Sequence, residues 1–141
     1  MKLLLDTNIL LDILQEKRPS HQASFLILEG AKKHLYEVQI STQSITDAMY
    51  IAIKNGIPFN ALSNLSYWML NHVNVDGPDA FHLRDALDGY SGDFEDDLQY
   101  AYALNNDCDY IITNDRKFIQ RKTPGDIKMM TPEEFVGRMR A

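Results

Sequence analysis

The sequence Met1-Lys2-Leu3-Leu4-Leu5-Asp6-Thr7-Asn8 joins a short apolar run to a carboxylate and two small polar side chains. Three consecutive leucines are typical of a strand that is buried on both faces of a parallel sheet. A charged Asp6 is costly to bury there without a partner, so we expect it at the carboxyl edge of the sheet. In open α/β folds, ligands bind at this edge.

Short apolar runs and helical patterns alternate along the rest of the chain. Strands are predicted at residues 3–5, 36–40, 73–75, 110–112 and 127–130. Helices are predicted at residues 9–14, 21–33, 44–54, 59–72, 79–87 and 94–104, with a last one after residue 131. This alternation predicts an α/β fold in which helices cover both faces of a parallel sheet.

Composition places the chain among soluble single domains. It has 141 residues, of which 45% are hydrophobic and 24% charged, and no apolar run is long enough to span a membrane. The first residues lack the features of a secretory signal, so we expect a cytoplasmic protein. A formal net charge of -6 argues against a general nucleic-acid coating protein, although an enzyme with a local basic patch remains compatible. Cys108 is the only cysteine, and we expect it to be buried and inert.

Acidic side chains also follow the fourth predicted strand and begin two predicted helices. Residues 109–115 read DYIITND, so Asp115 repeats the arrangement of Asp6. Asp47 lies in the first turn after the second strand. The first turn of the sixth helix holds three acids, Asp93, Asp96 and Asp97. Because strand ends and the helix starts that follow them share one edge, four segments of the chain can direct carboxylates into one pocket.

Each of these acids also has a structural explanation when taken alone. Asp6 can cap the helix that follows it, Asp47 and Asp96 can be acids favoured by the helix dipole, and Asp115 can be a turn residue. Together they are harder to explain, since two carboxylates about 4 Å apart repel by roughly 4 kcal/mol at an effective dielectric constant near 20. A divalent cation would compensate for this repulsion.

The chemistry of the donors selects the kind of ion. The four histidines are scattered and the single cysteine has no partner, so the sequence offers no zinc site. Aspartates with threonine and asparagine nearby suit Mg²⁺ or Mn²⁺, which act on substrate phosphates. The reaction class that follows is phosphodiester hydrolysis, in which the ion activates water and neutralises charge on the phosphate.

Four segments resemble the acidic motifs of the PIN-domain nucleases, and in particular the small VapC-type toxins of bacterial toxin-antitoxin pairs. The segments are LLLDTNILLDIL, ISTQSITDAMYI, SGDFEDDLQYAYAL and CDYIITNDRKF, and their order and approximate spacing are similar to those of the family. The resemblance spans nearly the whole chain. It implies a single PIN-like domain over residues 1–141, with a three-layer α/β/α sandwich around a parallel sheet of about five strands.

The resemblance also implies an activity and a set of site residues. It implies an endoribonuclease that depends on one or two Mg²⁺ or Mn²⁺ ions, forms a homodimer and is inhibited by a cognate antitoxin. The motifs match four catalytic and metal-binding acids, an outer metal ligand and two polar helpers, namely Asp6, Asp47, Asp96 and Asp115, then Asp93, then Asn8 and Thr113.

Three positions depart from the family pattern. The second motif usually has Glu where this chain has Asp47, whose side chain is one methylene shorter. The third motif usually has a small residue after the acid, whereas here Asp97 follows Asp96, and a helical wheel places Asp97 nearer the apolar stripe. Lys117 precedes Phe118 where the family often has an acid, which leaves fewer carboxylates for a second ion.

Basic residues near the acidic motifs are candidate RNA contacts. Arg116, Lys117, Arg121 and Lys122 follow Asp115, and Lys17 and Arg18 lie in the first loop. The alternative for each is a solvated surface position. We interpret Phe94, Tyr100 and Tyr102 as core residues rather than as stacking platforms for bases, because they lie on a helical apolar stripe.

Two other functional classes are alternatives to the nuclease. A catalytically weak PIN-fold module that binds RNA or a protein partner is compatible with Asp47 and Lys117. A phosphotransfer domain is disfavoured because Asn8 stands where aspartyl phosphatases of the haloacid type need a second Asp, and the acid-lysine set of response-regulator receivers is missing as well.

Overall fold

The computed structural model describes residues 1–121 and 127–140. Strands and helices alternate in these residues. The elements are β1 (Lys2–Leu5), α1 (Thr7–Leu14), α2 (His21–Lys32), β2 (Glu37–Ser41), α3 (Thr42–Lys54), α4 (Phe59–His72), β3 (Asn74–Asp76), α5 (Ala80–Asp88), α6 (Phe94–Asn105), β4 (Tyr110–Ile112), α7 (Arg116–Gln120), β5 (Lys128–Met130) and α8 (Pro132–Arg140).

The strands form one parallel sheet in the order β3-β2-β1-β4-β5. Residue Leu4 of β1 pairs with Gln39 on one side and with Ile111 on the other. The chain therefore builds the sheet outward from β1 in one direction through β3, and then returns to add β4 and β5 on the opposite side. The carboxyl ends of β1 and β4 lie at the point where this order reverses, which is the usual ligand position in open α/β sheets.

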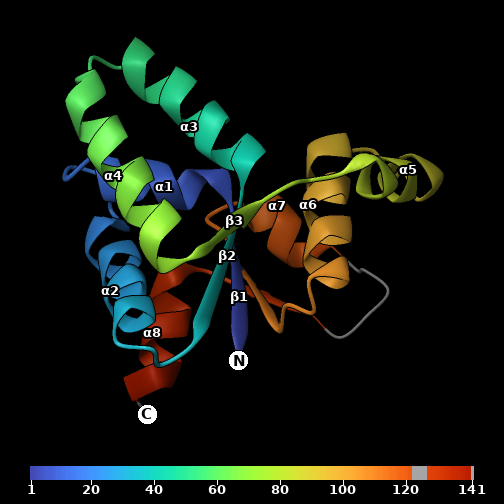
Figure 1. Cartoon of the computed structure of the whole chain (residues 1–141). Coiled ribbons are helices and arrows are strands. Elements are labelled where there is room, and N and C mark those ends of the chain that lie inside the picture. Colours follow the sequence, from blue (N-terminus) through green and yellow to red (C-terminus); the bar gives the residue numbers. More distant parts are fainter. Residues whose placement is uncertain (122–126, 141) are drawn as a thin grey trace.

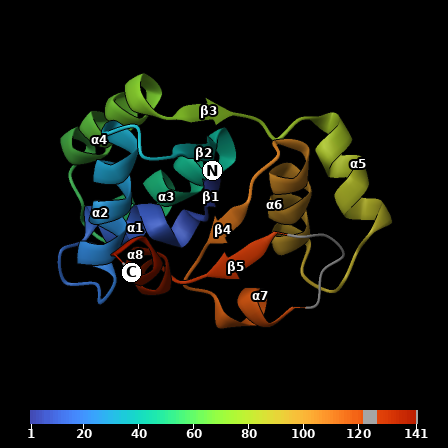
Figure 2. The ribbon, with the colours of Figure 1, turned by 90° about the horizontal axis from the view of Figure 1, so that it is seen from below.

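Helices cover both faces of the sheet, as Figures 1 and 2 show, with α1, α2, α3, α4 and α8 on one side and α5, α6 and α7 on the other. The leucines of β1 alternate between these layers. Leu3 and Leu5 pack into the larger core cluster, and Leu4 packs into the smaller one with Tyr102 and Phe118. Burial on both faces explains why the strand is apolar at every position rather than at every second one.

The structure confirms the predicted three-layer α/β fold and corrects some of its boundaries. All five predicted strands are present within one or two residues of their expected ends. Helix α3 begins at Thr42, because the Ser41 hydroxyl accepts a hydrogen bond from the Ser44 amide at 3.0 Å and so caps the helix earlier than predicted. The short helix α7 was not predicted, since its first residues are basic and carry no apolar stripe of helical length.

Further expectations about single residues are confirmed. Tyr100 and Tyr102 are buried core residues, and Cys108 is buried. Burial raises the pKa of the Cys108 thiol to about 11, so the thiolate is scarce at neutral pH. None of the helices formed by residues 1–121 and 127–140 is long and apolar enough to cross a membrane.

One helix position has no space for a side chain. A Cβ atom added at Gly30 in α2 would lie 2.2 Å from the Tyr36 hydroxyl oxygen. The Tyr36 side chain is fixed there, because it is buried and its hydroxyl donates a hydrogen bond of 2.7 Å to the Ile27 carbonyl. The close approach of α2 to this ring therefore requires glycine.

We expect Gly30→Ala to lower the free energy of unfolding by about 1–3 kcal/mol, because the added methyl group overpacks a filled core. The measurement is urea denaturation followed by circular dichroism. Gly137→Ala in α8 is the matched control, since a Cβ at Gly137 meets nothing within 4 Å and alanine favours helix. Equal effects of the two substitutions would contradict the packing argument.

Candidate active site

A cavity of about 490 Å³ opens at the carboxyl edge of the sheet. Residues from several elements line it. They include Asp6, Thr7, Asn8 and Leu11 near β1, Gln43, Ser44, Asp47, Tyr50 and Ile51 on α3, Pro78 after β3, Glu95, Asp96, Leu98 and Gln99 on α6, and Asp115 after β4. The structure thus brings the four predicted catalytic acids to one cavity.

Asp6 is the most extensively hydrogen-bonded of these acids. Its Oδ2 accepts from the Thr113 hydroxyl at 2.7 Å and from the Asn8 amide at 3.3 Å. Its Oδ1 accepts from the Thr7 backbone amide at 2.8 Å and from the Gln99 amide at 3.0 Å. All four donors are neutral, so they fix the carboxylate without cancelling its charge. Asn8 and Thr113, the predicted polar helpers, both contact Asp6 directly.

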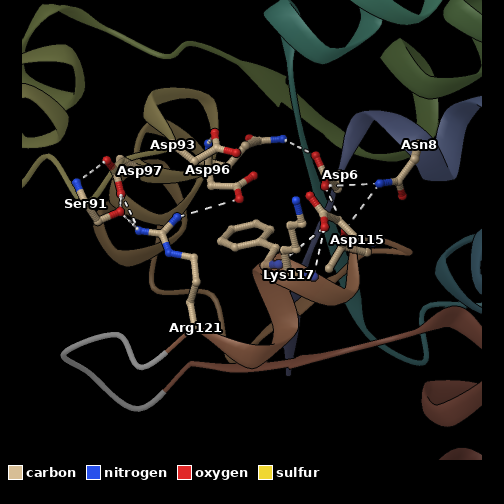
Figure 3. A network of polar contacts seen from close by, with 12 residues as sticks. Asp6, Asn8, Ser91, Asp93, Asp96, Asp97, Asp115, Lys117 and Arg121 are labelled. Atoms are coloured by element: carbon tan, nitrogen blue, oxygen red, sulfur yellow. Dashed lines mark hydrogen bonds and ion pairs between the residues drawn. The ribbon is translucent and has the colours of Figure 1, made fainter.

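Negative charge accumulates around Asp96, whose side chain points into the space between α6 and β1 (Figure 3). The pKa of Asp96 is raised to about 7, first by burial and then by the charges of Asp93, Asp115 and Asp6, while the Arg121 charge lowers it. These three carboxylates are therefore close enough to Asp96 to oppose its ionisation.

Asp97 has a different environment although it is the next residue. Its Oδ2 accepts a hydrogen bond of 2.9 Å from the Ser91 amide, and its Oδ1 accepts from the Ser91 hydroxyl and from the Arg121 guanidinium. Burial opposes ionisation of Asp97, but these hydrogen bonds and the Arg121 charge hold its pKa below the ordinary value. Figure 3 shows Asp97 turned away from Asp6 and toward Arg121. Asp96 is thus the acid that faces the cavity.

Arg121 connects these two acids. One terminal nitrogen of its guanidinium pairs with Asp97, and the other lies 3.7 Å from Asp96 Oδ2. The predicted contact of Arg121 with RNA phosphate stays a prediction, and its observed partners are acids of α6. Lys122, the next predicted contact, lies outside the described residues.

Asp47 lies further from the charged cluster than the sequence predicted. Because α3 begins at Thr42, Asp47 occupies its second turn rather than its first, and its side chain is exposed. It lines the cavity, but it is not among the acids whose charges raise the pKa of Asp96. Asp47 has a shorter side chain than the usual Glu and lies in the second turn of α3, so it remains at the wall of the cavity.

Three of the predicted site acids also cap helices. Asp6 caps α1, Asp93 caps α6 by accepting from the Asp96 amide at 3.1 Å, and Asp115 caps α7 by accepting from the Lys117 amide at 3.0 Å. In each cap, one carboxylate oxygen accepts the hydrogen bond from the helix backbone amide. The capping explanation and the charged-cluster explanation are therefore compatible, because a carboxylate has two oxygens.

A buried polar network supports the turn that carries Thr113 and Asp115. Asp12 on α1 is almost fully buried, and its carboxylate accepts from Arg18 Nε at 2.8 Å, from the Ser24 hydroxyl at 2.9 Å and from the Asn114 side chain at 2.6 Å. The Asn114 backbone amide in turn donates to Asn8 at 3.1 Å. These bonds hold the turn after β4 against α1.

The predicted RNA contacts occupy two different places. Arg18 is engaged by Asp12, and neither Arg18 nor Lys17 lines the cavity. Arg116 and Lys117 are exposed on the first turn of α7, directly after Asp115. In Figure 3 the Lys117 side chain extends toward the space beside Asp115. Of the two basic pairs, the one on α7 is therefore adjacent to the acids.

Two site residues were missed by sequence reasoning. The Gln99 amide donates to Asp6 and, at 3.1 Å, to the Ser44 hydroxyl, so it joins α6 to both β1 and α3. Ser44 also accepts a hydrogen bond of 3.0 Å from the Thr7 hydroxyl. Gln99 lies three residues after Asp96, on the same face of the helix, and this spacing was the available signal.

The donors around the cavity fit a hard divalent cation in kind. Asp6, Asp96 and Asp115 supply oxygens only, and the pKa of Asp96 is raised by burial and also by neighbouring negative charges that a cation would neutralise. As the side chains lie, however, no three acidic, histidine or cysteine groups within residues 1–121 and 127–140 are close enough together to hold an ion.

Comparison with known proteins identifies the family. A family model described as PIN domain matches residues 2–117. The chain belongs to the PIN domain family. This PIN domain is similar to Ribonuclease VapC1 of Aquifex aeolicus (strain VF5), with 28% identity over 142 residues that cover 97% of this chain and 94% of the relative.

Solved structures share the fold of this PIN domain. VapC20 of Mycobacterium tuberculosis, described as a sarcin-ricin loop cleaving toxin, matches with a TM-score of 0.67 and 13% identity over 82% of this chain and 92% of that chain. VapBC2 of Rickettsia felis, solved bound to a DNA fragment from its promoter, matches with a TM-score of 0.64 and 18% identity over 92% of this chain and 97% of that chain. At these identities the likeness concerns the fold.

The raised pKa of Asp96 predicts a pH-dependent stability. Asp96 keeps its proton up to about pH 7 in the folded chain but releases it near pH 3.8 when unfolded, so its contribution to stability falls as pH rises between these values. We expect Asp96→Asn to unfold with about 1–2 kcal/mol more free energy than the parent at pH 8, and with little difference at pH 4. Urea denaturation at both pH values measures this. A difference that does not change with pH would contradict the raised pKa of Asp96.

Proposed function

We propose that this protein is a divalent-metal-dependent endoribonuclease that hydrolyses RNA phosphodiester bonds. The observation that carries the proposal is the group of carboxylates from the end of β1, from α6 and from the β4–α7 turn, which line one cavity at the reversal point of the sheet and concentrate negative charge around Asp96. Membership of the PIN family and the likeness to Ribonuclease VapC1 support it.

The proposed roles follow the positions of the side chains. Asp6, Asp96 and Asp115 would hold one or two Mg²⁺ or Mn²⁺ ions, and Asp93 and Asp47 would act from further out. A bound ion would neutralise charge on the phosphate and lower the pKa of a nearby water molecule. Thr113, Asn8 and Gln99 hold Asp6 in place.

Basic side chains would position the RNA backbone. Arg116 and Lys117 begin α7 beside Asp115, so a phosphate at the acids would lie within reach of their charges. The predicted roles of Lys17 and Arg18 require RNA to extend along the loop between α1 and α2. Asp12 already pairs with Arg18, so we expect Lys17 to make the larger contribution of these two.

The biological setting we propose is that of a toxin in a toxin-antitoxin pair. The VapBC2 structure of Rickettsia felis supports a cognate antitoxin as partner, because a chain of that structure shares the fold of this protein. We further propose a homodimer that acts in the cytoplasm. A neighbouring reading frame that encodes a small DNA-binding protein would support the antitoxin, and its absence would count against it.

A catalytically weak module that binds RNA or a protein partner is the second candidate. It is favoured by the exposed position of Asp47, by Lys117 in place of an acid, and by the absence of a preformed three-carboxylate site among the described residues. Incubating purified protein with structured RNA in Mn²⁺ and in EDTA separates the two candidates. Discrete fragments that form only with Mn²⁺ support the nuclease, and retention of intact RNA by the protein in both buffers supports the module.

The adjacent acids Asp96 and Asp97 provide a matched pair of variants for the activity. We expect Asp96→Asn to lower the rate of RNA cleavage at least about a hundredfold, because this carboxylate faces the cavity. Asp97→Asn should cleave at close to the parental rate but lose about 2 kcal/mol of stability, because it breaks a largely buried ion pair. Cleavage is followed on gels and stability by thermal denaturation. Full activity in Asp96→Asn would place the chemistry elsewhere.

Metal binding should be visible without catalysis. We expect Mn²⁺ to raise the melting temperature of the parent by a few degrees, since an ion that binds only the folded chain stabilises it. The gain should shrink in Asp6→Asn, which retains the helix cap but removes one negative charge. Differential scanning calorimetry in Mn²⁺ and in EDTA measures both. An unchanged melting temperature in the parent would count against a metal site at these acids.

A further inference from the structure

Tyr50 is an aromatic residue of the cavity wall that no role described so far requires. It lies on α3, three residues beyond Asp47, and lines the same cavity as the acids. Its side chain is 62% exposed, so it contributes little to the core. Three residues advance a helix by about 4.5 Å, which places Tyr50 about one turn outward from Asp47. The ring therefore lies toward the mouth of the cavity.

The neighbouring side chain gives this ring a defined environment. Lys54 Nζ lies 4.4 Å from the centre of the Tyr50 ring, one helical turn further along α3. This contact favours one orientation of the ring and covers one of its faces with a positive charge. Because the Tyr50 side chain is 62% exposed, ring surface stays open to a flat ligand, and the Lys54 ammonium group is close enough to the ring to attract a phosphate of the same ligand.

The surroundings of Tyr50 also suit a nucleotide. Ile51 and Pro78 line the cavity with it, so an apolar wall faces the acidic residues of α6. A volume of about 490 Å³ falls within the range of small-molecule sites. Apolar contacts with a few directed charges are the features that hold a base and its phosphate together.

We propose that Tyr50 and Lys54 form a subsite for an unpaired nucleobase of the RNA substrate, in which the base stacks on Tyr50 and the adjoining phosphate meets Lys54. The subsite rests on the proposed ribonuclease function and specifies its substrate as RNA with a single-stranded segment. A base within a duplex is stacked on both faces and cannot occupy it. Stacking tolerates any base, so this subsite selects strandedness rather than sequence.

The experiment compares binding of two probes by fluorescence anisotropy, with Ca²⁺ in place of Mn²⁺ to support binding and gels to verify that the probes stay intact. One probe is a short single-stranded oligouridylate, and the other has the same ribose phosphates without bases. We expect Tyr50→Ala to weaken binding of the oligouridylate about tenfold or more and to leave the abasic probe unaffected. Tyr50→Phe keeps the ring and should bind both probes as the parent does.

Tyr67→Ala is the matched control. Tyr67 lies on α4, is 65% exposed and does not line the cavity, so its loss should change neither affinity. The proposal is overturned if Tyr50→Ala binds the oligouridylate as tightly as the parent, or if it weakens both probes equally. It is also overturned if sedimentation shows that Tyr50→Ala, but not Tyr67→Ala, dissociates a dimer, because Tyr50 would then contact a second copy of the chain.

Failure of the proposed nuclease gives a different pattern. If the parent cleaves no RNA in Mn²⁺ but its binding still depends on Tyr50 and on the presence of bases, the subsite stands and the catalytic function does not. If the parent cleaves RNA and the Tyr50 variants bind like the parent, the catalytic function stands and the subsite does not.

Discussion

The hydrogen bond of 2.7 Å from the Thr113 hydroxyl to Asp6 Oδ2 joins the two central strands at the point where the order of the sheet reverses. An ionised carboxylate at the end of a buried strand needs such donors, because its desolvation is otherwise costly. Thr113 also accepts from the Asp115 amide at 3.0 Å, so the same hydroxyl fixes the third acid of the cavity. The Thr113 hydroxyl thus ties the end of β1 to the end of β4 and to the residue that caps α7.

Asp96 and Asp97 illustrate how local partners separate two identical side chains. Both are buried in the first turn of α6, yet one faces other carboxylates and the other faces a guanidinium. A neighbouring arginine lowers the pKa of a buried carboxyl by forming an ion pair with it, whereas neighbouring acids raise that pKa by repulsion. The first turn of α6 thus carries one carboxylate that is paired with Arg121 and one that faces the cavity.

The strands and the convergence of acids could be predicted from sequence because they rest on local patterns. Leu3 to Leu5 and residues 110–112 are apolar runs that end in acids, and parallel pairing brings their ends together. The start of α3 was placed too late, because Ser41 and Ser44 both read as caps and only the hydrogen bond to Ser41 decides between them. Because α3 begins two residues earlier than predicted, Asp47 falls in its second turn rather than its first.

Other features of the site depend on contacts between distant segments and left no local signal. Arg121 pairs with Asp97 and Ser91, which lie 24 and 30 residues earlier in the chain, and no spacing predicts this contact. Gln99 on α6 reaches Asp6 and Ser44 only because β1, α3 and α6 meet at one edge. The helical wheel placed Asp97 near the apolar stripe, and Asp97 is buried in the structure. The wheel carries no information on its partner, Arg121.

The acids that cap helices have a consequence for how this chain can change by mutation. Asparagine caps a helix about as well as aspartate and occupies nearly the same volume, but it carries no charge. An aspartate codon becomes an asparagine codon through a single base change. Under the proposed site roles, a folded but inert descendant of this protein is therefore a single base change away at Asp6, Asp93 or Asp115, because the helix cap survives the loss of charge.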